Sequence, residues 1–329
     1  MRNILFLTSK YRTELMGVCI LWIMLFHSGV DAPANFVLRA LWYVFISFGG
    51  GFGVDIFFML SGYGLIYSVL SKGDSQSWSR YFKKRFIRIL PAYIIVASCY
   101  YAIICENAAE FFYNLSFLNF VFDGQRDFWY IFAIIVFYML FPLIVQLLRR
   151  LNISLSMLIL IVLWQIACCM LDRFYPVVYS NLEIMLQRFP CFCIGIYMGY
   201  QAVERRNGFW VLVFACTLAG LWMMFSGISF TGISRWIFTT MSLPVICILV
   251  LIIDIPYARF VSKCLKWCGK RSLELYLVHV SFGIFLMDIL PNRTFSLIVY
   301  FLGSFLLALV LHRYIDMINC ISRSKEIVS

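Results

Sequence analysis

The stretch FWYIFAIIVFYMLFPLIVQLLRR, residues 128–150, has no charged side chain before Arg149 and Arg150 at its end. About 20 mostly apolar residues allow an α-helix to cross the hydrocarbon core of a bilayer. Similar stretches recur from Leu15 to the C-terminal region, with short polar gaps between them. The chain of 329 residues is 63% hydrophobic and 13% charged, whereas a soluble domain is about 25% charged. The sequence therefore predicts a single integral membrane domain over residues 1–329.

Ten such stretches are expected to be helices, because lipid offers no hydrogen-bond partner to an unpaired backbone group. They cover residues 13–30, 51–70, 88–105, 128–148, 154–171, 184–202, 208–226, 236–253, 272–290 and 295–312. Residues 36–48 are also apolar and are separated from the second span by a glycine-rich segment, so they form either an interfacial helix or an extension of that span. The predicted fold class is an all-α polytopic membrane protein with about ten transmembrane helices.

Lysines and arginines are distributed unevenly over the loops between these spans. When the loops are placed on alternate sides, 21 of the 27 basic residues fall on one side and 5 on the other, and Arg188 lies within a span. The larger set is Arg2, Lys10, Arg12, Lys72, Arg80, Lys83, Lys84, Arg85, Arg88, Arg149, Arg150, Arg205, Arg206, Arg259, Lys263, Lys266, Lys270, Arg271, Arg313, Arg323 and Lys325. The smaller set is Arg39, Arg126, Arg173, Arg235 and Arg293. Because cytoplasmic loops carry the excess of Lys and Arg, both termini are predicted to be cytoplasmic and the protein to lie in the inner membrane.

The net charge of +11 and the twelve cysteines each suggest a function that their placement does not favour. The basic residues lie in short loops rather than on an amphipathic surface, so no nucleic-acid partner is expected. Most cysteines fall inside apolar spans, as small buried hydrophobic residues do. Cys264 and Cys268 lie in a basic loop without the further Cys or His ligands that zinc requires, so no metal site is expected.

A few ionisable side chains lie within the predicted spans, where they are costly and usually face a cavity or a partner. They include Glu14, His27, Asp55, Arg188, Glu274 and His279. Each has an alternative interpretation as an ordinary hydrogen-bonded contact between helices. Glu14 and Glu274, at the cytoplasmic edge, are expected to cap a helix or pair with neighbouring cations.

The depths of these side chains follow from the rise of 1.5 Å per helical residue. His27 lies about 21 Å from the inner end of the first span, and Asp55 and Arg188 each lie about 6 Å from the outer side, so these three are predicted to meet. Glu274 and His279 lie roughly 3 and 10 Å from the cytoplasmic side. That level is close to Arg85 and Arg88, which are either ligand-binding cations or ordinary membrane anchors.

Six segments, in order along the chain, resemble the membrane acyltransferase 3 family, whose members acylate sugars of envelope glycans. They are residues 14–27, 53–63, 81–93, 129–142, 188–199 and 269–279. The segment GVDIFFMLSGY, residues 53–63, is very similar to the second-span signature of the family. The segment YFKKRFIRILPAY, residues 81–93, resembles its basic stretch entering the third span. The resemblance implies a ten-helix membrane domain.

One residue departs from the family pattern. The first-span motif usually has an Arg eleven positions before its His, and this chain has Met16 there while retaining His27. Arg12 lies one turn earlier on the same helix face and is the candidate to replace that cation. The alternative is a catalytically silent family member.

The resemblance implies an O-acyltransferase whose donor is acetyl-CoA or another short acyl-CoA, with no permanently bound cofactor. Arg85 and Arg88 are expected to bind the donor phosphates by charge-assisted hydrogen bonds, together with Arg12. Tyr276 and His279 are expected to line the donor passage. The chain's other partners are then an extracytoplasmic glycan or lipid-linked sugar and the lipid bilayer.

The chemistry implied by the resemblance uses the outer group of residues. His27 is expected to be the general base on the acceptor hydroxyl, with Asp55 orienting its ring. An acyl-His intermediate is a variant of the same scheme. Arg188 is expected to stabilise the oxyanion or to bind the glycan, and Ser61 to contact the substrate. The alternative function is a polytopic glycan or lipid transporter, which would also use intramembrane charges.

Overall fold

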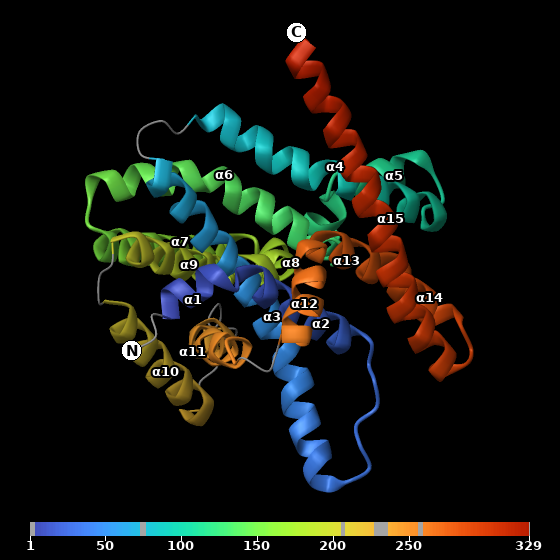
Figure 1. Ribbon diagram of the computed structural model, residues 1–329, viewed down its shortest axis with the longest axis horizontal. Helices are drawn as coiled ribbons and strands as arrows, with labels where there is room; N and C mark the ends of the chain where they lie inside the picture. Colours follow the sequence, from blue (N-terminus) through green and yellow to red (C-terminus); the bar gives the residue numbers. More distant parts are fainter. Residues whose placement is uncertain (1–3, 73–76, 205–207, 227–235, 256–258, 329) are drawn as a thin grey trace.

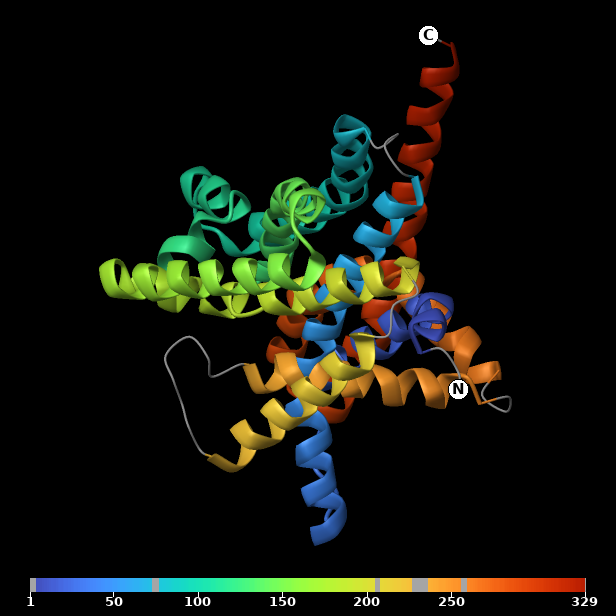
Figure 2. The same ribbon diagram turned by 90° about the vertical axis from the view of Figure 1, so that its left-hand side faces the viewer.

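The computed structural model describes residues 4–72, 77–204, 208–226, 236–255 and 259–328, and in these ranges the chain is helical and contains no strand (Figures 1 and 2). The helices are α1 (Ile4–Lys10), α2 (Arg12–His27), α3 (Phe36–Lys72), α4 (Trp78–Ile104), α5 (Ala108–Leu115), the π-helix η2 (Asn119–Asp123), α6 (Trp129–Arg150), α7 (Ile153–Phe174), α8 (Pro176–Leu186), α9 (Phe189–Glu204), α10 (Gly208–Ser226), α11 (Trp236–Ile253), α12 (Arg259–Lys270), α13 (Ser272–Val278), the π-helix η4 (His279–Gly283), α14 (Ile284–Ile289) and α15 (Arg293–Val328). The all-α prediction is confirmed.

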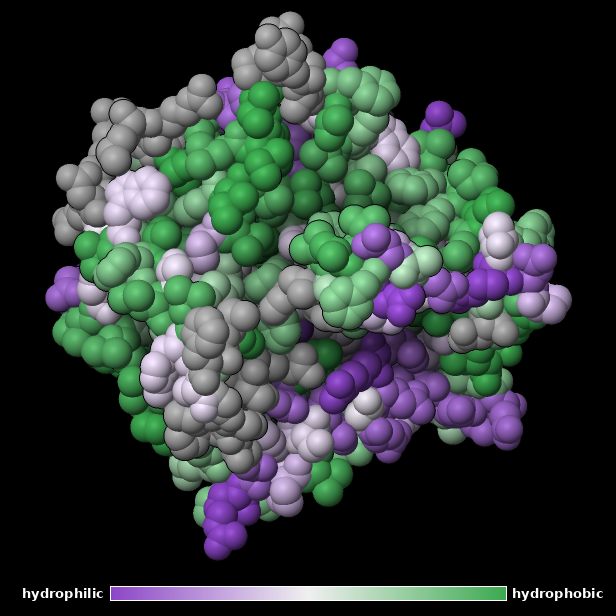
Figure 3. Space-filling view, turned by 90° about the horizontal axis from the view of Figure 1, so that it is seen from below, coloured by the Kyte–Doolittle hydropathy of each residue, from purple (hydrophilic) through white to green (hydrophobic). Residues whose placement is uncertain are grey.

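Six of the described helices are long and apolar enough to cross a membrane: residues 50–71 of α3, then α4, α6, α7, α11, and residues 293–318 of α15. Large apolar side chains also face outward, among them Phe36, Phe214 and Val310, which are 82%, 66% and 64% exposed. Apolar residues cover much of the face in Figure 3, while hydrophilic residues gather mainly along one side. These features are those of a membrane protein, because lipid replaces the protein interior around such side chains.

The apolar stretch before the second span is an extension of that span. Helix α3 continues without a break through Gly49, Gly50 and Gly51, and its first half projects from the rest of the bundle (Figure 1). Each helical glycine costs about 1 kcal/mol relative to alanine. A break within lipid would leave backbone groups without partners, which accounts for the continuous helix.

The predicted span 184–202 is instead two helices, because the chain breaks between α8 and α9. The carbonyl groups freed by the break find side-chain donors. Arg188 Nη1 donates to the carbonyl of Ile184 at 2.6 Å, and Trp164 Nε1 of α7 donates to that of Leu186 at 2.7 Å. A broken helix inside a membrane requires this kind of compensation.

The predicted basic loop around residues 259–271 forms the amphipathic helix α12. It packs antiparallel along the first turns of α2, with Gly17 facing Leu265 and Gly269 facing Thr13. A Cβ atom on either glycine would overlap a backbone carbonyl of the opposite helix. The glycines therefore allow the two backbones to touch.

Helices α3 and α9 make the most extensive contact in the described structure. They run parallel, with Gly195 against Met59 and Gly199 against Tyr63. Parallel packing is what the second and sixth of ten alternating spans require.

The basic residues Arg2, Arg205, Arg206 and Arg235 of the charge count lie outside the described residues.

Candidate active site

A cavity of about 270 Å³ lies between α2, α3, α4, α6 and the α12–α13 junction. Its charged lining residues are Arg12, Arg85, Arg88 and Lys270, and none of its described lining residues is a carboxylate. Ser61, Tyr130, Tyr138 and Tyr276 add polar groups to the wall. Of the five residues predicted to meet the donor, Arg12, Arg85, Arg88 and Tyr276 line this one space, and His279 is not among its lining residues. Ser61, predicted on the substrate side, lines the same cavity.

Arg12 reaches the cavity across α3. Its Nε donates to the carbonyl of Leu60 at 3.2 Å, and its guanidinium lies against Gly64, where a Cβ atom would overlap it. Met16, one turn further along α2, lines the same cavity. Arg12 therefore places a cation beside the position at which the family usually has one.

Arg85 lies between two aromatic rings. Its guanidinium carbon is 5.9 Å from the ring centre of Tyr81 and 5.7 Å from that of Tyr138. Its buried Nε has no hydrogen-bond partner within the described structure. A buried donor without a partner is rare in proteins, and here it belongs to a cation that lines a cavity.

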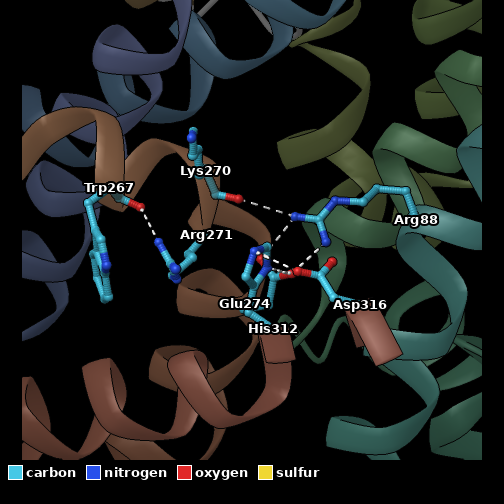
Figure 4. Close-up of polar contacts among 7 residues, drawn as sticks. All are labelled: Arg88, Trp267, Lys270, Arg271, Glu274, His312 and Asp316. Carbon is cyan, nitrogen blue, oxygen red and sulfur yellow. Dashed lines mark hydrogen bonds and ion pairs between the residues drawn. The ribbon is translucent and has the colours of Figure 1, made fainter. Parts of the chain in front are cut away.

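Arg88, in contrast, has a protein counter-ion. Both terminal nitrogens donate to the carboxylate of Glu274, with Nη2 3.0 Å from Oε2 (Figure 4). His312 Nδ1 lies 2.9 Å from Oε1 of Glu274, and His312 Nε2 lies 3.4 Å from Asp316. Arg271 turns away from this cluster and donates to the carbonyl of Trp267.

The two histidines predicted at different depths are in contact. His27 Nδ1, at the end of α2, lies 3.2 Å from His279 Nε2. His279 is fully buried and begins the π-helical turn η4, and its Nδ1 lies 2.8 Å from the carbonyl oxygen of Leu275. Single π-helical turns occur frequently at functional sites.

These contacts determine where the protons lie in the neutral pair. A carbonyl can only accept, so His279 Nδ1 carries a proton and His279 Nε2 is an acceptor. His27 must then donate from Nδ1, which leaves a lone pair on its Nε2. His279 thus orients His27 as a base at Nε2.

Asp55 does not take the orienting position that we expected. Arg188 Nε lies 3.1 Å from Asp55 Oδ1, the two side chains are 4% and 2% exposed, and the Arg188 guanidinium stacks 4.9 Å from the ring centre of Trp129. The predicted meeting of Asp55 and Arg188 therefore occurs, while the orienting partner at Nδ1 of His27 is His279.

The reason is the register of α2 and α3. Gly50 faces Phe26 and Gly53 faces Ile23 in this antiparallel pair. If this register is continued by two residues, Asp55 lies opposite the region near Leu21. Leu21 precedes His27 by six residues, which is about 9 Å along the helix. The estimate from sequence counted Asp55 from an assumed helix start near residue 51, whereas α3 begins at Phe36.

The cavity extends to within one helical turn of the histidine pair. Ile23 precedes His27 by four residues on α2, and Tyr276 precedes His279 by three, and both line the cavity. Residues at these spacings share a helix face. The rings of Tyr276 and His279 also lie 5.7 Å apart at a steep angle. A ligand filling the cavity would therefore end next to the histidines.

Two polar residues of this region were missed by sequence reasoning. Lys270 was counted only as a loop cation, and His312 lies at the last residue of the tenth predicted span. His312 could have been noticed from its residue type, because it is one of three histidines in the chain and it ends an apolar span.

The comparison with protein families agrees with this arrangement. Residues 15–313 match the model of the acyltransferase 3 family, described as an acyltransferase domain, and the chain belongs to this family. No curated protein and no solved structure matches it. The protein is a membrane acyltransferase, and the predicted family membership is confirmed.

Proposed function

We propose that the protein transfers an acetyl or other short acyl group from cytoplasmic acyl-CoA to a hydroxyl of an extracytoplasmic glycan of the cell envelope. The observation that carries this proposal is the cavity lined by cations that ends one helical turn from the His27–His279 pair. Such a transfer requires a binding site for the anionic donor and a general base, and the cavity and the histidine pair are suited to these two tasks.

The donor is held by its phosphates. Arg12 and Arg85 offer guanidinium groups to the cavity, and guanidinium pairs with phosphate through short charge-assisted hydrogen bonds. Arg12 takes the role of the cation that Met16 does not provide. Ser61 and Tyr276 lie where the narrow arm that carries the thioester would pass.

The reaction uses the free Nε2 of His27. This atom takes the proton of the acceptor hydroxyl while the oxygen bonds to the thioester carbonyl carbon. The carbon–sulfur bond then breaks, and the CoA thiolate takes the proton back from His27. His279 accepts the hydrogen bond from Nδ1 throughout, so it holds the ring and stabilises the imidazolium, as a triad carboxylate does.

Asp55 and Arg188 support the site without joining this proton transfer. Each compensates the charge of the other, which suits a contact that fixes α3 to the break between α8 and α9. The stacking of Arg188 on Trp129 extends the contact to α6.

The route from donor to glycan requires the ten-span topology in the cytoplasmic membrane, with both termini inside. Reporter fusions truncated after Arg150 and Lys270 should be cytoplasmic, and fusions at Asp123 and Asn292 extracytoplasmic, because of the uneven distribution of basic residues. Two reversed sites would contradict the topology.

The function is tested with purified full-length protein in lipid nanodiscs. Wild type given acetyl-CoA and envelope glycan should release free CoA and yield an acylated glycan by mass spectrometry, and His27→Ala should do neither. Glycan movement across the membrane without CoA release would indicate a transporter instead. Equal inactivity of wild type and His27→Ala towards several acyl-CoAs would indicate a silent family member.

A further inference from the structure

The buried carboxylate of Glu274 lies directly behind the donor cavity. Its side chain has no exposed surface, and it binds Arg88 of α4 and His312 of α15 (Figure 4). Of these three described residues, Arg88 is the one that also lines the cavity. Arg88 therefore lies between the Glu274 carboxylate and the cavity in which the donor is proposed to bind.

The guanidinium group of Arg88 can pair with either of two anions, the Glu274 carboxylate or a phosphate of the donor. Nη1 and Nη2 both donate to Glu274, and Nη2 also lies 3.4 Å from the carbonyl oxygen of Lys270. Any bidentate bond to a phosphate would need at least one of these two nitrogens. Arg12 contacts a backbone carbonyl and Arg85 contacts aromatic rings, so neither must leave a carboxylate to bind a ligand. Donor binding at Arg88 is thus an exchange of partners.

Such an exchange requires another cation for Glu274, because a buried carboxylate left alone is strongly unfavourable. His312 meets this requirement in its imidazolium form. Its Nδ1 lies 2.9 Å from Glu274 and its Nε2 lies 3.4 Å from Asp316. Both ring nitrogens donate when the ring is protonated, so His312 can hold both carboxylates at once.

We propose that Glu274 competes with the donor phosphate for Arg88, and that His312 compensates Glu274 when Arg88 turns to the donor. The proposal rests on the proposed function in one respect, the anionic donor. Its consequence is a donor affinity below the maximum that the cavity cations would allow. This moderation favours release of the product CoA, which has the same phosphates as the donor.

The test measures the affinity of the full-length protein for CoA by calorimetry, at one pH and one ionic strength. Glu274→Gln keeps the shape of the side chain and removes its charge, so we expect roughly tenfold tighter CoA binding, the scale of one charged hydrogen bond. Glu204→Gln is the matched control, because it removes an exposed carboxylate at the end of α9 away from the cavity lining. It should leave the affinity unchanged.

His312→Gln should have the opposite effect. Without the compensating cation, Glu274 retains Arg88, and CoA should bind several-fold more weakly. In the double variant His312→Gln with Glu274→Gln no carboxylate needs compensation. Its affinity should therefore equal that of Glu274→Gln alone.

Two results would overturn the competition. One is unchanged or weaker CoA binding by inserted Glu274→Gln protein, and the other is a His312→Gln loss that persists in the double variant. If Glu274→Gln does not insert, unchanged affinity of His312→Gln decides against the proposal. Absence of CoA binding by wild type would overturn the donor assignment as well, so the two failures are distinguishable.

Discussion

The Asp55–Arg188 ion pair and the cavity lined by cations hold buried charge in different ways. Asp55 and Arg188 compensate each other at 3.1 Å, and both are buried. The cavity is lined by four cations, of which Arg88 contacts a carboxylate, Glu274. The difference indicates that Asp55 and Arg188 form a structural contact, whereas Arg12 and Arg85 line the cavity without a described carboxylate partner and are available to an anionic ligand. Arg88 combines the two arrangements, because it pairs with Glu274 and also lines the cavity.

The two regions should therefore respond differently to mutation. Removal of one member of a buried pair leaves the other charge uncompensated, which costs about 3–5 kcal/mol of stability. Removal of one cavity cation reduces repulsion between like charges and removes a ligand contact. Variants of the Asp55–Arg188 pair are therefore expected to lose stability, and variants of the cavity cations are expected to lose CoA affinity.

The largest effect is expected at the residue that the cavity approaches. His27→Ala should lower the rate of acyl transfer by about 10²–10⁴, the scale for loss of a general base, with unchanged CoA affinity. Parallel measurements of CoA release and CoA binding separate the two quantities. Acyl transfer at the wild-type rate would remove His27 from the chemistry.

The next effect is on stability. Asp55→Ala should lower the free energy of unfolding by about 3–5 kcal/mol, because Arg188 is left buried and uncompensated. Arg85→Ala is the control from the cavity and should not destabilise the protein. Thermal unfolding in detergent measures both. Equal destabilisation by the two variants would contradict the comparison of the regions.

A smaller effect is expected at His279. Loss of its hydrogen bond in His279→Ala should raise the barrier by about 1–3 kcal/mol, which is a decrease in rate of roughly tenfold for each 1.4 kcal/mol. His279→Gln offers an acceptor oxygen to His27 Nδ1 and should recover part of the rate. A purely structural role would instead predict equal loss in both variants, with lower stability.

The smallest effect is expected at Gly64. A Cβ atom there would overlap the guanidinium of Arg12, so Gly64→Ala should displace Arg12 and weaken CoA binding several-fold. Gly303→Ala is the matched control, because a Cβ atom at Gly303 meets no described atom within 4 Å. Equal affinities of the two variants would argue that Arg12 does not contact the donor.

Much of the fold was predictable from apolar stretches bounded by polar residues. Residues 208–226 and 236–253, two of the predicted spans, are helical throughout. The break at Arg188 was not predictable, because it depends on partners from elsewhere in the chain, and the sequence left the continuity of residues 36–72 open as one of two alternatives. Trp164 satisfies a carbonyl at the break, and no local pattern indicates that contact.

The candidate site was predictable in its members more than in its pairings. Arg85, Arg12 and Tyr276 line one cavity, and their contact with the donor stays a prediction. The pairing of His27 with His279 depends on helix tilt, register and side-chain reach. A depth that is counted at 1.5 Å per residue from an uncertain helix end takes no account of tilt, register or side-chain reach.

The most direct test of the account is an experimental structure of the protein with a non-hydrolysable thioether analogue of acetyl-CoA. We expect phosphate oxygens within hydrogen-bond distance of Arg12 and Arg85, and the acyl carbon beside Nε2 of His27. Phosphates bound outside the cavity, or an acyl end directed away from His27, would contradict it.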